Sequence, residues 1–255
     1  MKDFSLGLYE SMLLTLQNKF SNIITFKEYF TNYPDVTDFL ILRHDVDRKP
    51  DNALVMAELE AKLGVSSVYY FRTKKHTYKP EIIKRIAELG HEVGYHYESL
   101  TDCKGDFSEA LNDFELNLAK LRKLCQIETI AMHGAPFSPF DNRELWKSKG
   151  NKKLLLENLE ILGEVYLDIE YQDILYITDT GRNWQQSSSN RRDKVESKIN
   201  LSFDSSDQLF SYFDHKPHNR FIFQTHPERW TDHWLQWHIQ YFKDQLINQV
   251  KSIIR

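Results

Sequence analysis

Residues 38–47, DFLILRHDVD, place four apolar side chains directly before a short polar cluster. The apolar run, Phe39–Leu42, is typical of a buried strand. Asp45 and Asp47 then fall at the end of that strand. Burying an unpaired carboxylate costs several kcal/mol or forces it to take up a proton, so these two acids need partners. The usual partners are a metal ion, a helix N-terminus or a salt bridge.

Strand-like and helix-like segments alternate along the first half of the chain. Residues 52–64 and 79–90 have helical spacing and end in glycine, whereas residues 65–73 and 91–98 read as strands. Regular alternation indicates a parallel sheet or barrel with helical crossovers. We therefore predict an α/β fold in a single domain, 1–255, with residues 1–37 as a helical extension packed on it.

The composition excludes several classes of protein. A formal net charge of -4 on 255 residues gives no reason to expect a nucleic-acid partner. The two cysteines, Cys103 and Cys125, lack the spacing of a zinc motif and the density of a disulfide scaffold. No stretch approaches the ~20 apolar residues of a membrane span, and the N-terminal residues lack a signal peptide's apolar run. We expect a cytoplasmic protein.

Polar clusters follow several of the predicted strands. They are His44-Asp45-Val46-Asp47, His96-Tyr97-Glu98, His133-Gly134-Ala135-Pro136 and His226-Pro227-Glu228. In parallel α/β folds the carboxyl ends of the strands meet at one edge, where sites are built. A single histidine at a strand end is more often a hydrogen-bonded structural residue, but four clusters in the same topological position indicate a shared site.

These clusters resemble the motifs of the polysaccharide deacetylase superfamily (the NodB-homology group, carbohydrate esterase family four). RHDVD, residues 43–47, is similar to the D-x-D variant of the first motif, and ELGHEVGYHYESL, residues 88–100, is similar to the second. HGAP stands where the third is expected, DTGRNW resembles the fourth, and FQTHPE resembles the fifth. The resemblance spans about residues 40–230, with strong matches at the first two motifs.

The resemblance implies a distorted (β/α) barrel with a divalent metal, often zinc, that removes acetyl groups from N-acetylated sugars. It implies Asp45 as the catalytic base, with Asp47 and His96 as metal ligands. Asp179 and Trp184 stand in the fourth motif, and His226 corresponds to the histidine of the fifth.

The chain departs from the family's pattern in two places. The second of two metal-binding histidines falls on Leu100, which cannot bind a metal, and the residue nearest to the third motif's usual base-pairing arginine is His133. From the spacing we infer that His133 fills the empty position, giving Asp47, His96 and His133 as ligands. Glu98 is the alternative ligand, because residues i and i+2 of a strand share a face.

Two imidazoles and a carboxylate suit zinc with an open coordination position, and also iron or another first-row ion. Zinc lowers the pKa of bound water to about 7 and polarises an amide carbonyl. Asp45 would take the proton of that water, and His226 would protonate the leaving amine or stabilise the oxyanion. His44, Glu98 and Asp179 are expected to support these side chains through hydrogen bonds.

Aromatic residues beside the motifs suggest a carbohydrate cleft, because sugar rings stack on flat aromatic surfaces. We expect Tyr97, Trp184 and Trp230 to line it. The other aromatic residues beside the motifs are Tyr95, Phe137 and Phe140. Within a closing helix predicted over residues 234–254, the spacing of Trp234, Trp237 and Tyr241 predicts a core-facing side.

The first functional hypothesis is a metal-dependent amide hydrolase that deacetylates an N-acetylated sugar or a sugar precursor in polysaccharide biosynthesis. The second is a deacetylase-fold protein that has lost turnover and acts as a carbohydrate-binding or assembly module, which the leucine at position 100 favours. The third is a metal hydrolase of a non-sugar amide, since the metal and base set the reaction while the pocket sets the substrate.

Overall fold

The structure is a computed structural model, which describes residues 3–32, 36–147, 150–185, 192, 194–199, 201–215 and 218–253. Residues 1–2 and 33–35 of the predicted N-terminal extension, and residue 254 of the predicted closing helix, lie outside the described residues.

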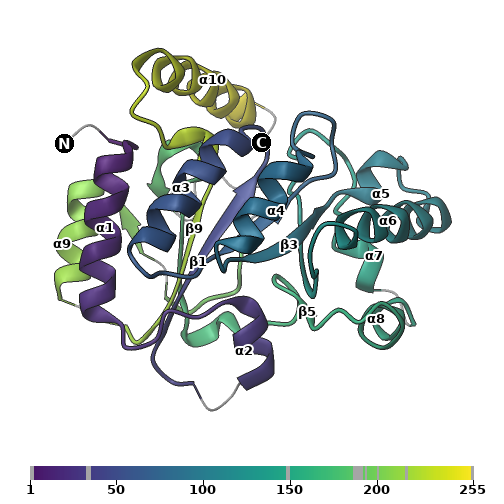
Figure 1. Cartoon of the computed structure of the whole chain (residues 1–255). Helices are drawn as coiled ribbons and strands as arrows, with labels where there is room; N and C mark the ends of the chain where they lie inside the picture. Colours follow the sequence, from purple (N-terminus) through teal and green to yellow (C-terminus); the bar gives the residue numbers. More distant parts are fainter. Residues whose placement is uncertain are drawn as a thin grey trace.

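A seven-stranded sheet forms the centre of the molecule, in the order β5-β4-β3-β2-β1-β9-β6 (Figure 1). All of its neighbouring strands pair in parallel. The sheet curls into a half-barrel with helices around it. It does not close, because β5 and β6 remain as edge strands. This confirms the predicted parallel α/β fold of the distorted-barrel type. The strands are β1 (Phe39–Val46), β2 (Val68–Phe71), β3 (Glu92–Tyr97), β4 (Thr129–Met132), β5 (Gly163–Glu164), β6 (Leu175–Thr178) and β9 (Arg220–Thr225).

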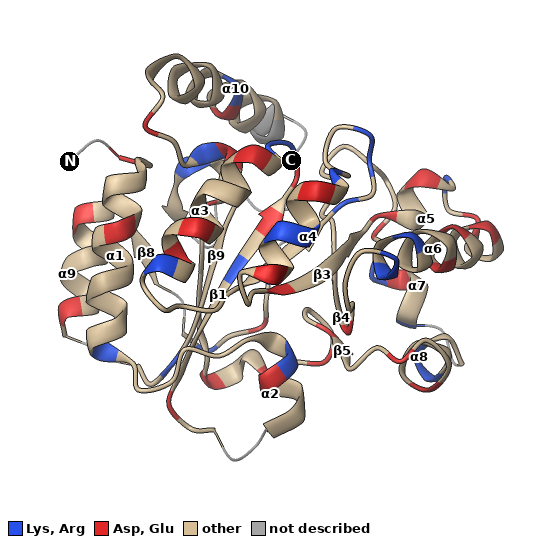
Figure 2. Cartoon of the chain, in the orientation of Figure 1, with Lys and Arg blue, Asp and Glu red and all other residues tan. Residues whose placement is uncertain are grey.

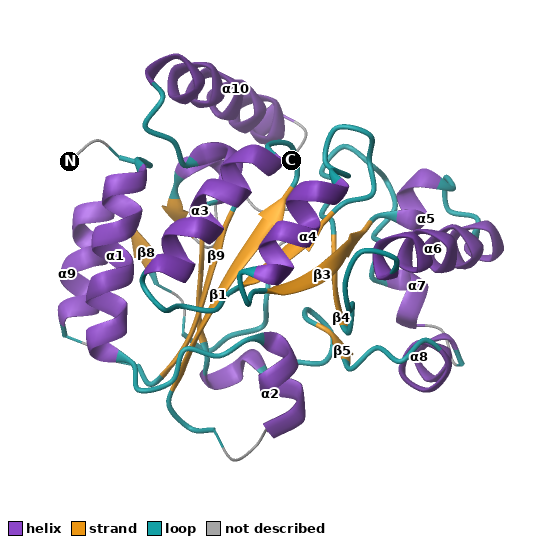
Figure 3. Cartoon of the chain, viewed as in Figure 1, coloured by secondary structure: helices purple, strands orange, loops and turns teal. Residues whose placement is uncertain are grey.

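Helices connect the strands and cover the sheet (Figure 3). They are α1 (Leu6–Lys19), α2 (Phe26–Asn32), α3 (Pro50–Lys62), α4 (Pro80–Glu88), α5 (Ser99–Asp102), α6 (Phe107–Arg122), α7 (Glu144–Lys147), α8 (Asn151–Lys153), α9 (Ser206–Asp214) and α10 (Trp234–Ile253). Short 3-10 turns at Thr180–Arg182 and Pro227–Arg229 follow β6 and β9, and β7 (Trp184–Gln185) pairs with β8 (Ser202–Phe203) in a small antiparallel ribbon. Within the described residues, none of the helices combines the length and apolar character needed to cross a bilayer.

The order of the strands determines where the polar clusters meet. β1 lies between β2 and β9, and every residue of β1 is buried. Its last residues pair in register with the ends of its neighbours, Val46 with Phe71 and His44 with Thr225. The polar residues after β1, β3, β4, β6 and β9 therefore gather at one edge of the sheet, as expected for parallel strands.

Helix α10 differs from the prediction of a core-facing side. Trp234 and Tyr241 are exposed and Trp237 is only half-buried, whereas the polar residues Gln240 and Asp244 are buried. Asp244 accepts a hydrogen bond from Arg182, and Asn248 donates one to the Gly181 carbonyl. Polar contacts, which helical spacing alone does not reveal, therefore hold this helix on the molecule.

Candidate active site

A small cavity lies at the edge of the sheet where the polar clusters meet. Its walls include the side chains expected to do chemistry, which are Asp45, Asp47, His96, His133 and His226. Its volume is about 80 Å³, room for a few water molecules, since each occupies about 30 Å³ in the liquid. Asp244, Ile247 and Asn248 of α10 form another part of the wall. The cavity as it stands is smaller than the 300–1,000 Å³ typical of ligand pockets.

Asp45 is buried at the cavity and is held by two side chains. The Arg43 Nε and Nη2 groups donate to its two carboxylate oxygens, each at 2.8 Å, and the Gln224 amide donates to Oδ2 at 2.5 Å. Tyr176 in turn donates to the Gln224 carbonyl, which fixes the orientation of that amide. Burial acts to raise the pKa of Asp45, but Arg43, His96 and His226 together outweigh it and the pKa is lowered. Asp45 is therefore ionised at neutral pH, as a general base must be.

Arg43 pairs with Asp45, although the family's usual arginine partner was expected from the third motif. It lies on β1 two residues before Asp45, so the two side chains share one face of the strand. Its guanidinium is fully buried and lies over the Tyr166 ring, with 4.6 Å from Cζ to the ring centroid. Its i, i+2 spacing from Asp45 was the signal that could have revealed it.

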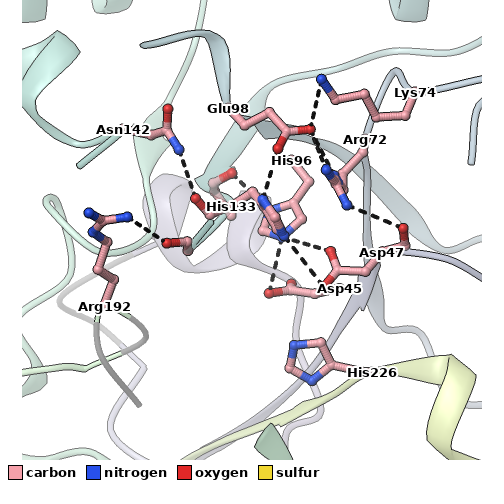
Figure 4. Close-up of polar contacts among 12 residues, drawn as sticks. Asp45, Asp47, Arg72, Lys74, His96, Glu98, His133, Asn142, Arg192 and His226 are labelled. Atoms are coloured by element: carbon pink, nitrogen blue, oxygen red, sulfur yellow. Dashed lines mark hydrogen bonds and ion pairs between the residues drawn. The ribbon is translucent and has the colours of Figure 1, made fainter. Parts of the chain in front are cut away.

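Asp47, His96 and His133 face one another across the cavity (Figure 4). The Nε2 atom of His96 lies 3.4 Å from Oδ1 of Asp47, and Nε2 of His133 lies 3.7 Å from Oδ2. The His96 Nδ1 group donates to the Ala131 carbonyl at 3.0 Å, which leaves the Nε2 lone pair directed at the carboxylates. Oδ1 of Asp47 is buried and has no hydrogen-bond partner. An imidazole lone pair beside two carboxylates is stable only when a proton or a cation lies between them.

These donors fit a metal ion in kind and nearly in distance. Neighbouring donors of a tetrahedral zinc site lie about 3.3 Å apart, given bonds of about 2.0–2.1 Å. The two separations, 3.4 and 3.7 Å, need only small movements to reach that value. Among the described residues, however, no group of three or more histidine, cysteine, aspartate or glutamate side chains is already drawn together as a formed metal site. Leu100, at the position of the missing family ligand, packs in the hydrophobic core.

Glu98 lies behind His133 and orients it. The His133 Nδ1 group donates to Oε2 of Glu98 at 3.0 Å, while Arg72 and Lys74 bind Oε1 at 2.6 and 3.3 Å. Burial acts to lower the pKa of His133, but Asp47 and Glu98 outweigh it and raise the pKa to about 9. Glu98 thus supports His133 in this structure and turns its own carboxylate towards Arg72, away from the ligand role that the sequence left open.

His226 lies on the other side of the cavity with Asp179 behind it. Its Nδ1 group donates to Oδ1 of Asp179 at 2.6 Å, so Nε2 is the nitrogen available to the cavity. Arg229 and the Trp230 indole also donate to Asp179, at 3.3 and 2.8 Å. Burial and Arg229 act to lower the pKa of His226, but Asp179 and Asp47 together outweigh them and the pKa is raised. A raised pKa suits a histidine that gives up a proton during the reaction. Asp244 of α10 ties this group to the closing helix by lying 3.5 Å from Arg229.

The structure corrects the prediction for His44. Its side chain points to the opposite face of β1, where Nδ1 lies 2.7 Å from the Thr225 hydroxyl and Nε2 lies 2.8 Å from Glu60. His44 therefore contacts neither Asp45 nor Asp47. The alternation of side chains along a strand explains this, because His44 and Asp45 are adjacent residues.

The three aromatic residues predicted to line a sugar cleft are also corrected. Tyr97 packs in the core against Phe114, and Trp184 stacks on Phe4 with ring centroids 5.3 Å apart. Trp230 is fully buried and binds Asp179 instead. The exposed aromatic ring at the rim of the cavity belongs to Phe137, which is 60% exposed. Adjacency in the sequence placed the first three beside the motifs, but burial removed them from the surface.

Comparison with known proteins finds no matching family model and no match among curated proteins. The solved structures that match include members of carbohydrate esterase family four, the family that the sequence motifs resemble. One is a family four pseudoenzyme from Bacillus anthracis, with 14% identity and a TM-score of 0.46, where the match covers 85% of this chain and 61% of that one. The present chain thus spans about three fifths of the length of that pseudoenzyme.

Two further structures extend this comparison. The family four domain of a multidomain xylanase from the hindgut metagenome of Trinervitermes trinervoides has 13% identity and a TM-score of 0.43, over 84% of this chain and 85% of that one. A peptidoglycan N-acetylglucosamine deacetylase has 14% identity and a TM-score of 0.45, over 93% of this chain and 90% of that one.

Proposed function

We propose that this chain is a divergent polysaccharide deacetylase, a metal-dependent amide hydrolase that removes an acetyl group from an N-acetylated sugar or sugar precursor. The observation that supports this most is that a set of metal-binding side chains and a histidine–aspartate pair face each other across one cavity. Asp47, His96 and His133 present metal-binding atoms on one side, and His226 backed by Asp179 lies on the other. Asp45, held by Arg43, lies between them as an ionised base.

Each residue has a role in this proposal. Asp47, His96 and His133 would hold the metal, most simply zinc, which when bound polarises the amide carbonyl and acidifies water. Asp45 accepts a proton from the attacking water. His226 donates a proton from Nε2 to the leaving nitrogen, while Asp179 keeps its ring in place through Nδ1. The small cavity has room for the acetyl group, and Phe137 at its rim offers a flat surface on which the sugar ring can stack.

Leu100 favours a second candidate function. It stands where the family has its second metal-binding histidine, and it packs in the hydrophobic core. A protein that has kept the fold but lost turnover, and acts as a carbohydrate-binding or assembly module, would need no ligand at that position. The third candidate, a metal hydrolase of a non-sugar amide, shares the metal and the base but would release no acetate from sugars.

Metal content and acetate release distinguish these candidates. The full chain, purified without a His-tag, is analysed for metal and assayed on N-acetylglucosamine oligomers and on nucleotide-linked N-acetylglucosamine. Variants His96→Ala and His133→Ala test the ligands, and His215→Ala, which changes an exposed histidine outside the cavity wall, is the matched control.

We expect near-stoichiometric metal in the unmodified protein and in His215→Ala, and its loss from both ligand variants. Metal retained by His133→Ala would exclude His133 as a required ligand. Protein that stays metal-free after zinc is supplied, and releases no acetate, would overturn the deacetylase proposal in favour of the binding module. Stoichiometric metal with no acetate from any sugar would favour a non-sugar amide.

A further inference from the structure

The closing helix α10 turns polar residues towards the protein and apolar residues towards solvent, the opposite of an ordinary surface helix. Its polar residues Gln240 and Asp244 are buried against the molecule, with the Gln240 amide donating to Asp244 at 3.0 Å. An ordinary surface helix turns its apolar stripe inward and its polar residues to water. Figure 2 shows α10 on the outside of the molecule, mostly in tan, with few charged residues along it.

The outward side of α10 carries a continuous apolar stripe. It consists of Leu235, Ile239, Phe242, Leu246 and Val250, all of them exposed. Phe242 and Leu246, in the middle, are each 62% exposed. If each side chain offers about half of its surface, the stripe amounts to roughly 500 Å², near the upper end of what a typical monomer exposes. A patch near this upper end is often functional, and an interaction site is one such function.

The spacing of the stripe suits another helix. Its residues follow one another at intervals of four, three, four and four, close to the heptad spacing of a two-helix seam. On a helical wheel these positions form a narrow band, and the exposed rings of Trp234 and Tyr241 lie apart from it, beyond Gln249, His238 and Gln245. A helix lying in a membrane surface has a broader apolar face flanked by lysine and arginine. The flanking residues here are mainly Gln236, His238, Gln245 and Gln249. Lys243 is the one charged and exposed side chain among those described on α10. The described side chains of α10 thus form no basic flank that anionic lipids would attract.

The stripe is also self-complementary. Its positions are nearly symmetric about the midpoint of α10, so that in an antiparallel pair Leu235 would meet Val250 of the second copy, and Ile239 would meet Leu246. Phe242 would lie beside the two-fold axis. Isologous contacts of this kind are the commonest in homo-oligomers. With the glutamine rim added, the area approaches the ~800 Å² per partner of a standard interface.

We propose that the apolar stripe of α10 is an interface for a second copy of this chain, formed by antiparallel pairing of two α10 helices. The interface braces the helix that walls the candidate active site. Asp244, on the inward side of α10, contacts Arg182 and Arg229 and also lines the cavity. This proposal does not depend on the chemistry of the cavity.

The test is the mass of the full chain in solution, measured by sedimentation velocity over a wide range of protein concentration. We expect twice 30.4 kDa for the unmodified chain and 30.4 kDa for Leu246→Lys. Leu116→Lys on α6 is the matched control, because Leu116 is also a leucine on a helix and is 64% exposed. It should remain a dimer. An unmodified chain that is a monomer throughout, or a Leu246→Lys variant that keeps the dimer mass, would overturn the proposal.

A cross-link keeps the test decisive if the lysine variant folds poorly. In a background with Cys103→Ser and Cys125→Ser, oxidised Phe242→Cys should form a covalent dimer, and Leu116→Cys should remain uncross-linked. Equal cross-linking of the two variants would contradict the proposal. So would a monomeric chain that sediments with phosphatidylglycerol vesicles and loses that binding in Leu246→Lys, because the stripe would then be assigned to a membrane.

Discussion

The two faces of β1 each carry buried charged groups, and they differ in how completely those groups are paired. On one face His44 joins the Glu60 cluster, in which the Glu60 carboxylate also accepts hydrogen bonds from Tyr9, Ser67 and Tyr69. On the other, the carboxylate of Asp45 is paired with Arg43, but next to it Asp47 has a buried oxygen without a hydrogen-bond partner.

The difference separates a structural cluster from a site. Both oxygens of Glu60 have donors from the chain itself, so the cluster needs nothing from outside. Asp47 and the Nε2 lone pair of His96 face each other as acceptors, and a proton on His133, or a cation in its place, balances the charge of Asp47. A buried polar group left unsatisfied is costly, and such costs are found mainly where function requires them. The Glu60 cluster nonetheless supports the site, since His44 fixes Thr225, the residue before His226.

The largest expected effect is on turnover, from Asp45→Asn. Acetate release should fall by about 10²–10⁴-fold, because a positioned general base contributes that much. Metal content should be unchanged. The melting temperature should also fall, since the buried Arg43 charge loses its partner. Kinetics are therefore measured well below the transition.

The matched control for that variant is Asp141→Asn. Asp141 pairs with Arg143 at the same i, i+2 spacing but outside the cavity. Full turnover in Asp45→Asn, or an equal loss in Asp141→Asn, would remove Asp45 from the role of base.

The next effect compares the stability of the two faces directly. Glu60→Gln places an amide nitrogen against hydroxyl donors and should destabilise the fold by about 3–5 kcal/mol, as breaking a buried charged network does. Asp47→Asn should destabilise the metal-free protein by less, about 1–3 kcal/mol, since it removes the charge that faces His133 but no hydrogen bond to Oδ1. Urea unfolding of both metal-free variants measures this. Equal losses would mean that both clusters are structural.

A smaller effect is expected on metal affinity from Glu98→Gln. Because Glu98 accepts from Nδ1 of His133 and so directs Nε2 at Asp47, its loss should weaken metal binding by about 10–100-fold. Asp102→Asn is the control, since Asp102 also binds Lys74 but does not touch His133. Competition with a metal-sensitive dye reports the affinity. A total loss of binding in Glu98→Gln would instead make Glu98 a ligand.

The smallest effect is a pH dependence of stability with opposite signs on the two faces. Burial raises the pKa of Glu60, but His44 outweighs it and lowers the pKa from 4.5 to about 2, so this stabilisation is present above pH 4.5 and is lost as pH falls towards 2. The pKa of His133 is raised from 6.5 to about 9, so its stabilisation is present below pH 6.5 and is lost as pH rises towards 9.

Each group should account for about 1–3 kcal/mol in the metal-free protein. Urea midpoints are measured across this pH range. The fall in stability towards low pH (the acid limb) should disappear in Glu60→Gln, and the fall towards high pH (the alkaline limb) should disappear in His133→Asn. An alkaline limb that persists in His133→Asn would assign it to another group.

The sequence by itself determined the succession of strands and helices and the residues that meet at the sheet edge. Strand and helix periodicity are local, and parallel strands necessarily bring their carboxyl ends together. Asp45, Asp47, His96, His133 and His226 could therefore be placed at one cavity before any coordinates were known.

Tertiary structure alone decided which neighbours those residues acquired. Arg43 became the partner of Asp45 because both lie on the same face of β1, and His44 went to Glu60 because it lies on the other. Packing buried Trp184 and Trp230. Ion pairs from Arg182 and Arg229 to Asp244 hold the polar side of α10 against the molecule. These outcomes depend on contacts between residues far apart in the chain, which local periodicity does not encode.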